Sequence, residues 1–419
     1  MMTGGLFFPT SHYGDTWRKM RRVAQEALSK NFTHKFHAIQ AKEAILLTHS
    51  LLVDPTPWDS HLRRTTASTL LSMVYDTPPL ISEKDPRIIR VNDFMERLGR
   101  AGYPGAYLVE YFTWMRYLPS WMAKWKRDVL EQSKIDDAMF RGLFNEVGDR
   151  VAQGDRLSGF SAHLLDEKDR HGLDEKESVW AAATLYGAGA DTVLNLRYTD
   201  SDTHGAIIQT SVALQWCLFA ILSFPEVQRR AQAELDAVVG RSRMPTFADY
   251  ENLPYVRALI KETLRWAPLG PIGLPHRLME DDYYDGYLIP KGSMTYNPNQ
   301  GYEPGPGSIW SKCGFIRTLS PFGRTWATDR RYSRHQGGGA PYFLASGEAN
   351  DSLFVGCANI LWALSIEAFY DENGAPIIPS LDEGITPGIV IRPPEFRCSF
   401  KPRFPNVAEI VSNSKELIE

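Results

Sequence analysis

An acidic side chain and an alcohol stand next to each other at Asp191 and Thr192, directly after the small-residue run Gly187–Ala190. A carboxyl group beside a hydroxyl can pass a proton to a bound reactant, which is the work of a general acid. Small residues such as Ala188 and Gly189 let a flat cofactor approach a helix backbone, and a threonine hydroxyl can loosen a helix by bonding back to a carbonyl. The competing interpretation is a plain packing face of small residues.

Glu262 and Arg265 are three residues apart, so on a helix they share one face and can form a bidentate, charge-assisted ion pair. The same spacing recurs at Glu167/Arg170 and Glu226/Arg229. For those two pairs, a solvated ion pair on a helix surface is the simpler interpretation. An apolar helix leads into Glu262 and a Pro-Gly-rich chain follows Arg265, so we expect this pair to be buried at a fixed structural junction.

These two blocks resemble signatures of the cytochromes P450. The first resembles the oxygen-activating motif of the family's I helix, and the second its Glu-x-x-Arg motif in the K helix. Near the start of the chain, Trp17 and Arg21 match the Trp-x-x-x-Arg pattern of the C helix. The resemblance implies that this indole N–H and guanidinium donate to a haem propionate. His276 stands where many relatives have an arginine that also reaches a propionate, although a neutral histidine brings no fixed charge.

The resemblance implies a mainly α-helical P450 fold with a small β component, incomplete, in one domain over residues 1–419. Its implied cofactor is haem b, iron protoporphyrin IX, with Asp191 and Thr192 as catalytic residues and Ala188 and Gly189 as cofactor contacts. The implied reaction inserts one oxygen atom from dioxygen into a small hydrophobic organic substrate. Electrons would come from NADPH through NADPH–cytochrome P450 reductase. The pattern resembles fungal, microsomal-type oxidoreductases of secondary metabolism or xenobiotic oxidation, which implies an endoplasmic reticulum membrane location.

Composition is compatible with this interpretation. The 419 residues are 43% hydrophobic and carry a net charge of -4, so the chain can bury a large core and has no basic bias of the nucleic-acid-binding kind. Four scattered cysteines predict neither a disulfide scaffold nor a Cys-x-x-Cys metal site. No signal peptide is visible, and the longest strongly apolar run, Trp216–Phe224, is far shorter than the roughly 20 residues that span a bilayer. In the family a long N-terminal stretch precedes the C helix, which begins here at residue 13, so we expect an N-terminally truncated chain.

Apolar residues recur at helical spacing in five stretches: Ala24–Leu52, Val129–Gln153, Lys176–Thr192, Val212–Val239 and Tyr255–Trp266. Between the first two, the segment Tyr117–Arg127 resembles the F–G loop of fungal microsomal P450s. Its tryptophans beside lysines suit a lipid interface, so this segment is predicted to touch a membrane surface. The alternative is an ordinary Trp-rich loop between helices.

The helical pattern breaks between Val193 and Gln209, where a polar stretch follows Thr192. Without these residues, Thr192 joins Thr210 and a continuous I helix is restored. Every valine codon begins with GT and one glutamine codon ends in AG, so the stretch can be a retained intron translated in frame. A true loop inside the oxygen-activating helix would displace its groove. We therefore predict that residues 193–209 are an insertion.

A second break falls on the iron ligand. The family's ligand is a cysteine thiolate in a Phe-x-x-Gly-x-Arg-x-Cys-x-Gly loop, and this pattern is missing. The L-helix pattern resumes at Ala349–Ala358, and counting back without gaps places the lost ligand near Phe343. Other reading frames through this region can spell fragments of the motif, so residues 295–348 are predicted to be partly out of frame. None of the existing cysteines fits the ligand loop: Cys217, Cys313, Cys357 and Cys398.

Two hypotheses remain. The first is a haem-thiolate monooxygenase by family. The second is a catalytically inactive relic or a faulty gene model, at best a haem-free helical protein. Without a cysteine in the ligand loop, iron could at best be held by an adventitious histidine such as His335. The substrate is unreadable because the B–C region that shapes specificity in the family is absent.

Overall fold

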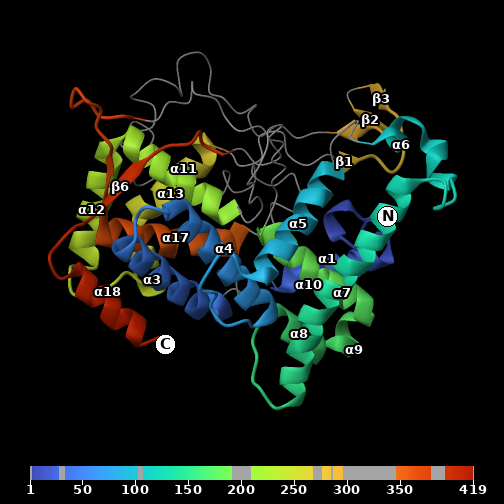
Figure 1. The fold of residues 1–419 in the computed structure, drawn as a ribbon, viewed down its shortest axis with the longest axis horizontal. Helices are drawn as coiled ribbons and strands as arrows, with labels where there is room; N and C mark the ends of the chain where they lie inside the picture. The colour runs from blue at the N-terminus through green and yellow to red at the C-terminus, as the bar shows by residue number, and fades with distance from the viewer. Residues whose placement is uncertain are drawn as a thin grey trace.

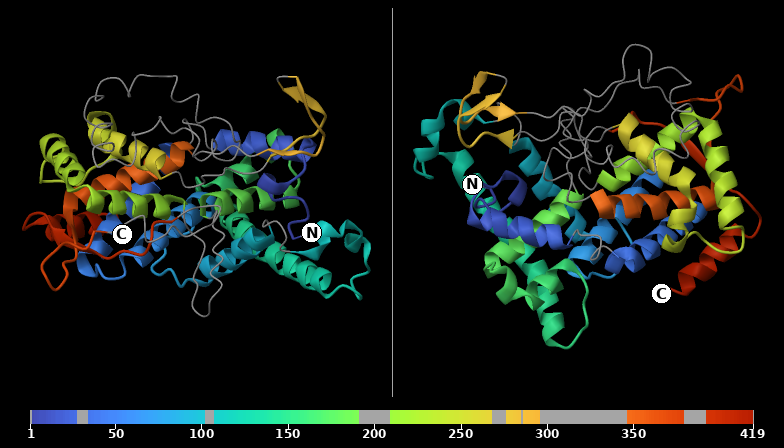
Figure 2. Two further views of the ribbon diagram at one scale, coloured as in Figure 1. Left: turned by 90° about the horizontal axis from the view of Figure 1, so that it is seen from above. Right: turned by 180° about the vertical axis from the view of Figure 1, so that it is seen from behind.

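The computed structural model describes residues 2–27, 34–101, 107–190, 209–267, 276–284, 286–295, 346–378 and 392–418. Helices dominate these residues, and the two termini lie far apart (Figure 1; Figure 2). The first half contains α1 (Asp15–Ala27), α3 (His37–Val53), α4 (Trp58–Tyr75), α5 (Pro86–Ala101), α6 (Leu108–Tyr111), α7 (Lys124–Ala152), α8 (Phe160–Asp166), α9 (Lys168–His171) and α10 (Glu175–Ala190). The second half contains α11 (Gln209–Ser223), α12 (Pro225–Val238), α13 (Pro254–Trp266), α17 (Ser346–Ala363) and α18 (Val407–Glu416). Short 3-10 turns connect them: η1 (Phe8–Thr10), η2 (His34–Phe36), η3 (Thr113–Tyr117) and η4 (Phe247–Asn252).

The β component of the described residues consists of three two-stranded antiparallel sheets. They pair β1 (His276–Arg277) with β4 (Met294–Thr295), β2 (Asp282–Tyr284) with β3 (Tyr287–Ile289), and β5 (Leu364–Ala368) with β6 (Cys398–Pro402). In the first sheet His276 lies opposite Thr295, and in the third Ile366 lies opposite Phe400. The expected mainly α fold with a small β component is therefore confirmed.

Two large hydrophobic cores stabilise the helices. One gathers apolar side chains of α1, α5, α7, α8 and α10. The other gathers those of α3, α11, α12, α13, α17 and α18 together with β5 and β6. Helix α4 lies between them, since its Leu62 belongs to the second core and its Leu71 to the first (Figure 1). This central helix therefore fixes how the two halves pack.

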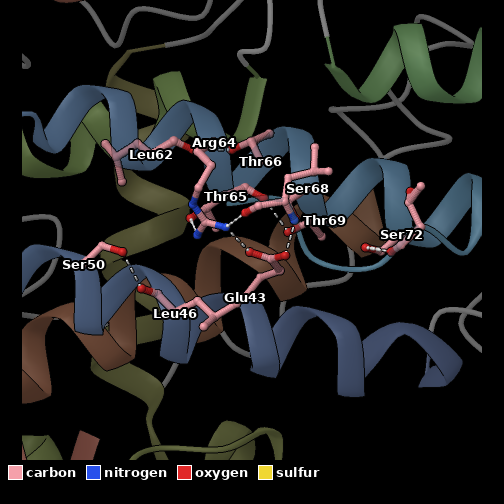
Figure 3. Close-up of polar contacts among 12 residues, drawn as sticks. Glu43, Leu46, Ser50, Leu62, Arg64, Thr65, Thr66, Ser68, Thr69 and Ser72 are labelled. Carbon is pink, nitrogen blue, oxygen red and sulfur yellow. Dashed lines mark hydrogen bonds and ion pairs between the residues drawn. The ribbon is translucent and has the colours of Figure 1, made fainter. Parts of the chain in front are cut away.

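A buried polar network joins α4 to α3 (Figure 3). The Glu43 carboxylate accepts a hydrogen bond from the Arg64 guanidinium at 2.9 Å and another from the Ser68 hydroxyl. Arg64 also donates to the Leu80 carbonyl at 3.0 Å and to the Thr65 hydroxyl at 2.6 Å. Burial raises the pKa of Glu43 despite the Arg64 charge. Because both charges are fully buried, the network fixes the register of α3 against α4 more than it adds to stability.

The end of α4 also positions α8. Asp76 follows α4 in the left-handed region, at a φ of 50°, and its carboxylate accepts the backbone N–H groups of Ser158 and Gly159 at about the start of α8. A side chain on Gly159 would overlap the Asp76 carboxylate. Glycine is therefore required where this carboxylate caps the helix.

Two of the five stretches with helical spacing contain more than one helix. The stretch Val212–Val239 is divided into α11 and α12, which meet at an angle of 108°. Pro225 begins α12, and Phe224 before it has the non-helical angles φ -133° and ψ 76°, because proline disfavours the α conformation in its preceding residue. The stretch Ala24–Leu52 contains the end of α1, the turn η2 and α3, with residues 28–33 outside the described part. The helical spacing therefore holds in both stretches, and the breaks lie within them.

Helix α17, which corresponds to the predicted L helix, packs against α3. The His37 imidazole lies 3.2 Å from the Asp351 carboxylate and is stacked on the Phe247 ring. The Gln40 amide donates to the Ser352 hydroxyl at 2.9 Å. Two polar contacts at its N-terminal half therefore hold α17 in register, directly after the segment that the sequence assigns to the iron ligand.

Candidate functional site

Trp17 and Arg21 lie one turn apart on α1 and contact each other. The Arg21 guanidinium carbon is 5.2 Å from the centre of the Trp17 ring, a cation–π distance. Phe8 and Tyr13 pack on the same indole, with ring centres 5.5 and 5.1 Å away. Among the described residues no carboxylate pairs with Arg21. A half-buried guanidinium that is oriented but has no acidic partner is suited to an anionic group.

The small-residue run at the end of α10 is tightly packed on one side. A Cβ atom on Gly187 would lie 3.0 Å from the Met95 sulfur and 3.3 Å from the Phe7 ring, so this glycine permits close approach of α5 and the N-terminal segment. Ala188 and Gly189 follow in the last turn of α10, and their side-chain surroundings are not described. Asp191, Thr192 and the predicted insertion Val193–Gln209 lie outside the described residues, apart from Gln209 at the start of α11. The packing interpretation therefore holds for Gly187, and the catalytic assignment of Asp191 and Thr192 remains a prediction.

The predicted ion pair on α13 is present. Arg265 donates through Nε and Nη2 to the two carboxylate oxygens of Glu262, at 2.8 and 2.5 Å. The Glu262 side chain is 6% exposed and that of Arg265 24%. In the pair Glu167/Arg170 the exposures are 41% and 55%, and in Glu226/Arg229 they are 35% and 74%. Spacing is identical in all three, so tertiary packing alone distinguishes the first.

Another carboxylate holds the start of α13, and no local pattern in the sequence pointed to it. Glu234 on α12 accepts the backbone N–H of Tyr255 at 2.8 Å and that of Val256 at 3.0 Å. In the first turn of a helix these N–H groups have no carbonyl partner within the helix, and they lie next to the positive end of the helix dipole. Burial nevertheless raises the pKa of Glu234, because desolvation outweighs the two amide hydrogen bonds. Glu234 lies 21 residues before Tyr255, which no capping pattern in sequence could reveal.

His276 lies in β1, where it pairs with Thr295 in the register of the first sheet. Its side chain is not described, so its expected contact with a propionate stays a prediction. Phe343, the position assigned to the lost ligand, and His335 fall outside the described residues.

Comparison with known proteins decides the family. A family model described as "Cytochrome P450" matches residues 202–298. Over 100% of its length the chain is 45% identical to a cytochrome P450 monooxygenase of Armillaria gallica, and it covers 78% of that protein. The chain belongs to the cytochrome P450 family. It is also 40% identical to cytochrome P450 monooxygenase 253 of Postia placenta, covering 98% of this chain and 76% of that one. The P450 monooxygenase iboC of Amanita muscaria is 32% identical, with 99% and 80% of the two chains covered.

A solved P450 structure shares the fold. A zebra fish cytochrome P450 determined with progesterone superposes with a TM-score of 0.68, over 96% of this chain and 86% of that one, at 21% identity. This similarity shows the P450 fold alone. The assignment of α1, α10, α13 and α17 to the C, I, K and L helices of the family rests on the sequence motifs and stays a prediction.

Among the described residues, Trp17 and Arg21 suit contact with a haem propionate, whereas none of the described cysteines is placed to bind the iron. Arg21 has a guanidinium without an acidic partner, beside the Trp17 indole, which suits a propionate. The described cysteines do not offer a ligand: the thiols of Cys217 and Cys357 face each other at 3.3 Å, and Cys398 is buried in β6. Burial raises the pKa of Cys398 to about 12, so in the metal-free protein this group is a neutral thiol. Cys313 is outside the described residues.

A small cavity with a mixed polar and apolar lining lies where four helices of this P450 meet. Its lining includes Glu43 of α3, Thr69 of α4, Thr210 of α11 and Ser352 of α17, and its volume is about 30 Å³. Since a water molecule needs roughly 10–15 Å³ measured in this way, the cavity has room for about two to three waters. An organic substrate does not fit it.

The segment resembling the F–G loop is largely exposed. Tyr117 and Trp121 are each 73% exposed, and Met122 is exposed beside them. The end of this segment is helical, because α7 begins at Lys124, and Arg127 donates to the carbonyls of Ser120 and Trp121 at 3.0 and 2.7 Å. In the described part of the chain, no single helix has the length and apolar character of a membrane span; α11 and α12 meet that criterion only together, as a bent pair, by length and composition.

Proposed function

We propose that this P450 is by descent a haem-thiolate monooxygenase that inserts one oxygen atom from dioxygen into a small hydrophobic organic substrate. The observation that carries this proposal is the match over the whole chain to the Armillaria gallica monooxygenase. Haem b would supply the iron centre that activates dioxygen, and NADPH–cytochrome P450 reductase would deliver the electrons. Residues 1–419 form one P450 domain in this proposal.

Each motif then has a task. Arg21 and the indole N–H of Trp17 donate to a haem propionate and orient the cofactor, with His276 as a further donor. Ala188 and Gly189 leave room for the flat ring system beside α10. Asp191 and Thr192 hold and pass a proton at the oxygen-binding side. Glu262 and Arg265 act only structurally, by fixing α13.

The exposed aromatic segment Tyr117–Arg127 contacts the surface of the endoplasmic reticulum membrane in this proposal. Amphipathic tryptophan and tyrosine rings beside basic side chains favour the lipid interface. The exposure of Tyr117 and Trp121 supports this role.

A second hypothesis, an inactive P450 relic or faulty gene model, is favoured by the absence of the cysteine-ligand motif from the sequence. None of the three described cysteines is free for an axial position, and residues 295–348 lack the ligand motif. Sequencing the transcript across codons 190–212 and 290–350 discriminates between the two. A cysteine codon within a restored Phe-x-x-Gly-x-Arg-x-Cys-x-Gly frame supports the enzyme, and its absence supports the relic.

The biochemical test compares the chain as written with a repaired chain that lacks residues 193–209 and carries Phe343→Cys. After reduction under carbon monoxide, we expect the red-shifted thiolate Soret band only from the repaired chain, because an iron held by His335 lacks a thiolate donor. The same repaired chain with Phe343→Ser is the matched control. A thiolate band from the chain as written would show that an existing cysteine is the ligand, and the assignment of Phe343 would be wrong.

A further inference from the structure

Two cysteine thiols from different helices meet in the second hydrophobic core. Cys217 lies on α11 and Cys357 on α17, and their sulfur atoms are 3.3 Å apart. The two residues are separated by 140 positions in the sequence. Cys398, the third described cysteine, is also buried, but no other described cysteine is hydrogen-bonded to it. The close thiol contact is therefore a product of how α11 packs on α17.

The surroundings hold the two sulfurs in this position. Both cysteines lie within regular helices and belong to one apolar cluster. Next to the pair, a Cβ atom on Gly356 would lie 3.8 Å from the Leu214 side chain, so the helices are already in close contact at this level. Sulfur atoms in a disulfide are about 2.05 Å apart. Covalent bonding therefore requires the two sulfur atoms to approach by about 1.3 Å.

We propose that Cys217 and Cys357 are a redox-sensitive pair that hydrogen peroxide converts into an intramolecular disulfide linking α11 to α17. One sulfur attacks a peroxide oxygen, so that an S–O bond forms, the O–O bond breaks, and a sulfenic acid and water result. The second sulfur then attacks the first, an S–S bond forms, and the hydroxyl leaves as a second water. Two thiols lose two electrons and two protons, and the peroxide takes up both.

Burial determines which oxidant can act. Glutathione disulfide is too large to reach sulfurs inside the core, whereas hydrogen peroxide is small and uncharged. The hydrogen bond with Cys217, together with burial, raises the pKa of Cys357. Its thiol stays protonated at neutral pH, so oxidation is slow and needs prolonged exposure. The pair thus responds to sustained peroxide.

The disulfide would close a long segment of chain. That segment contains α12, α13 and the strands β1 to β4, and it ends within α17. Closing it would keep α17 against α11 while restricting the unfolded chain. This effect does not depend on a haem and goes beyond the proposed monooxygenase function.

The test uses the full chain as written, incubated with hydrogen peroxide, unfolded in the presence of an alkylating reagent and digested without reduction. Mass spectrometry should find the Cys217 peptide joined to the Cys357 peptide, lighter than their sum by two hydrogens, and dithiothreitol should separate them. The melting temperature of the oxidised protein should rise by about 5 °C. Cys398→Ala is the matched control, a buried cysteine outside the pair, and should show the same link and the same rise.

The variants Cys217→Ala and Cys357→Ala should show neither the link nor the rise. If circular dichroism shows that either variant is unfolded, peptide mapping of the wild type and of Cys398→Ala decides alone. Peroxide treatment in urea should scatter the links over all four cysteines, because selectivity comes from the fold. Alkylation of both Cys217 and Cys357 after treatment of the folded protein, or a preferred link to Cys313 or Cys398, would overturn the proposal. So would the predicted link without a change in melting temperature, since the cross-link would then not constrain the chain.

Discussion

Replacing Glu262 by alanine tests whether the buried ion pair on α13 is a structural junction. The substitution leaves the Arg265 guanidinium in a largely buried position without the two carboxylate oxygens that accept its hydrogen bonds at 2.8 and 2.5 Å. Removing one partner of a fully buried pair costs roughly 3–5 kcal/mol. Because the Arg265 side chain is 24% exposed, water recovers part of this loss. We therefore expect the free energy of unfolding to fall by about 2–4 kcal/mol.

Glu226→Ala is the matched control, since Glu226 forms the same i,i+3 pair with Arg229 on another helix. Its arginine is 74% exposed, and exposed pairs contribute about 0–1 kcal/mol. Urea unfolding of the chain as written, followed by far-ultraviolet circular dichroism, measures both variants against the parent. The midpoint of Glu262→Ala should fall well below that of Glu226→Ala.

A double variant separates the loss of the Glu262–Arg265 ion pair from the loss of packing. If the cost comes from losing this ion pair, Arg265→Ala in the Glu262→Ala background should cost little more, and the two effects should be strongly non-additive. Equal midpoints for Glu262→Ala and Glu226→Ala would refute the reasoning, because burial would then make no difference at identical spacing.

Two further predictions concern the packing around α4. Gly159→Ala should destabilise the protein by roughly 1–3 kcal/mol in urea unfolding, because its Cβ overlaps the Asp76 carboxylate that caps α8. Gly142→Ala is the control, since Gly142 lies on α7 with open space around it, and this substitution should be neutral or stabilising. An equal loss of stability in both variants would contradict the clash. Glu43 has a raised pKa in the folded state, so its contribution to stability is fully present below its ordinary pKa of 4.5 and is lost as the pH rises through the folded pKa. Glu43→Gln keeps an oxygen acceptor for Arg64, so in this variant that part of the pH dependence of the melting temperature should vanish. An unchanged pH profile would assign the dependence to other groups.

Local chemistry was sufficient to predict several features of this P450. Helices occur where apolar residues recur at helical spacing, and α13 begins and ends within one residue of the predicted stretch Tyr255–Trp266. The pairing of Glu262 with Arg265 could be predicted, because side chains three positions apart on a helix lie on the same face. Trp17 and Arg21 are neighbours for the same reason.

The break between α11 and α12 has a physical cause that hydrophobic spacing does not report. In Val212–Val239 the spacing continues across Pro225, although the backbone turns there by 108°. Apolar spacing indicates which face of a helix is buried, whereas the break depends on one backbone restriction at the residue before proline.

What only the tertiary structure decided is burial and contact between distant segments. Three Glu-x-x-Arg pairs have the same spacing, and only packing of α13 against α11, α12 and α17 buries one of them. The cap that Glu234 provides for α13 and the contact between Cys217 and Cys357 join segments that are 21 and 140 residues apart. The sequence alone determined the family motifs and the local faces of the helices, because these depend on neighbours within a turn or two. Which polar or thiol groups meet in the core depends on how whole helices pack, since that packing sets both the distance and the exclusion of water.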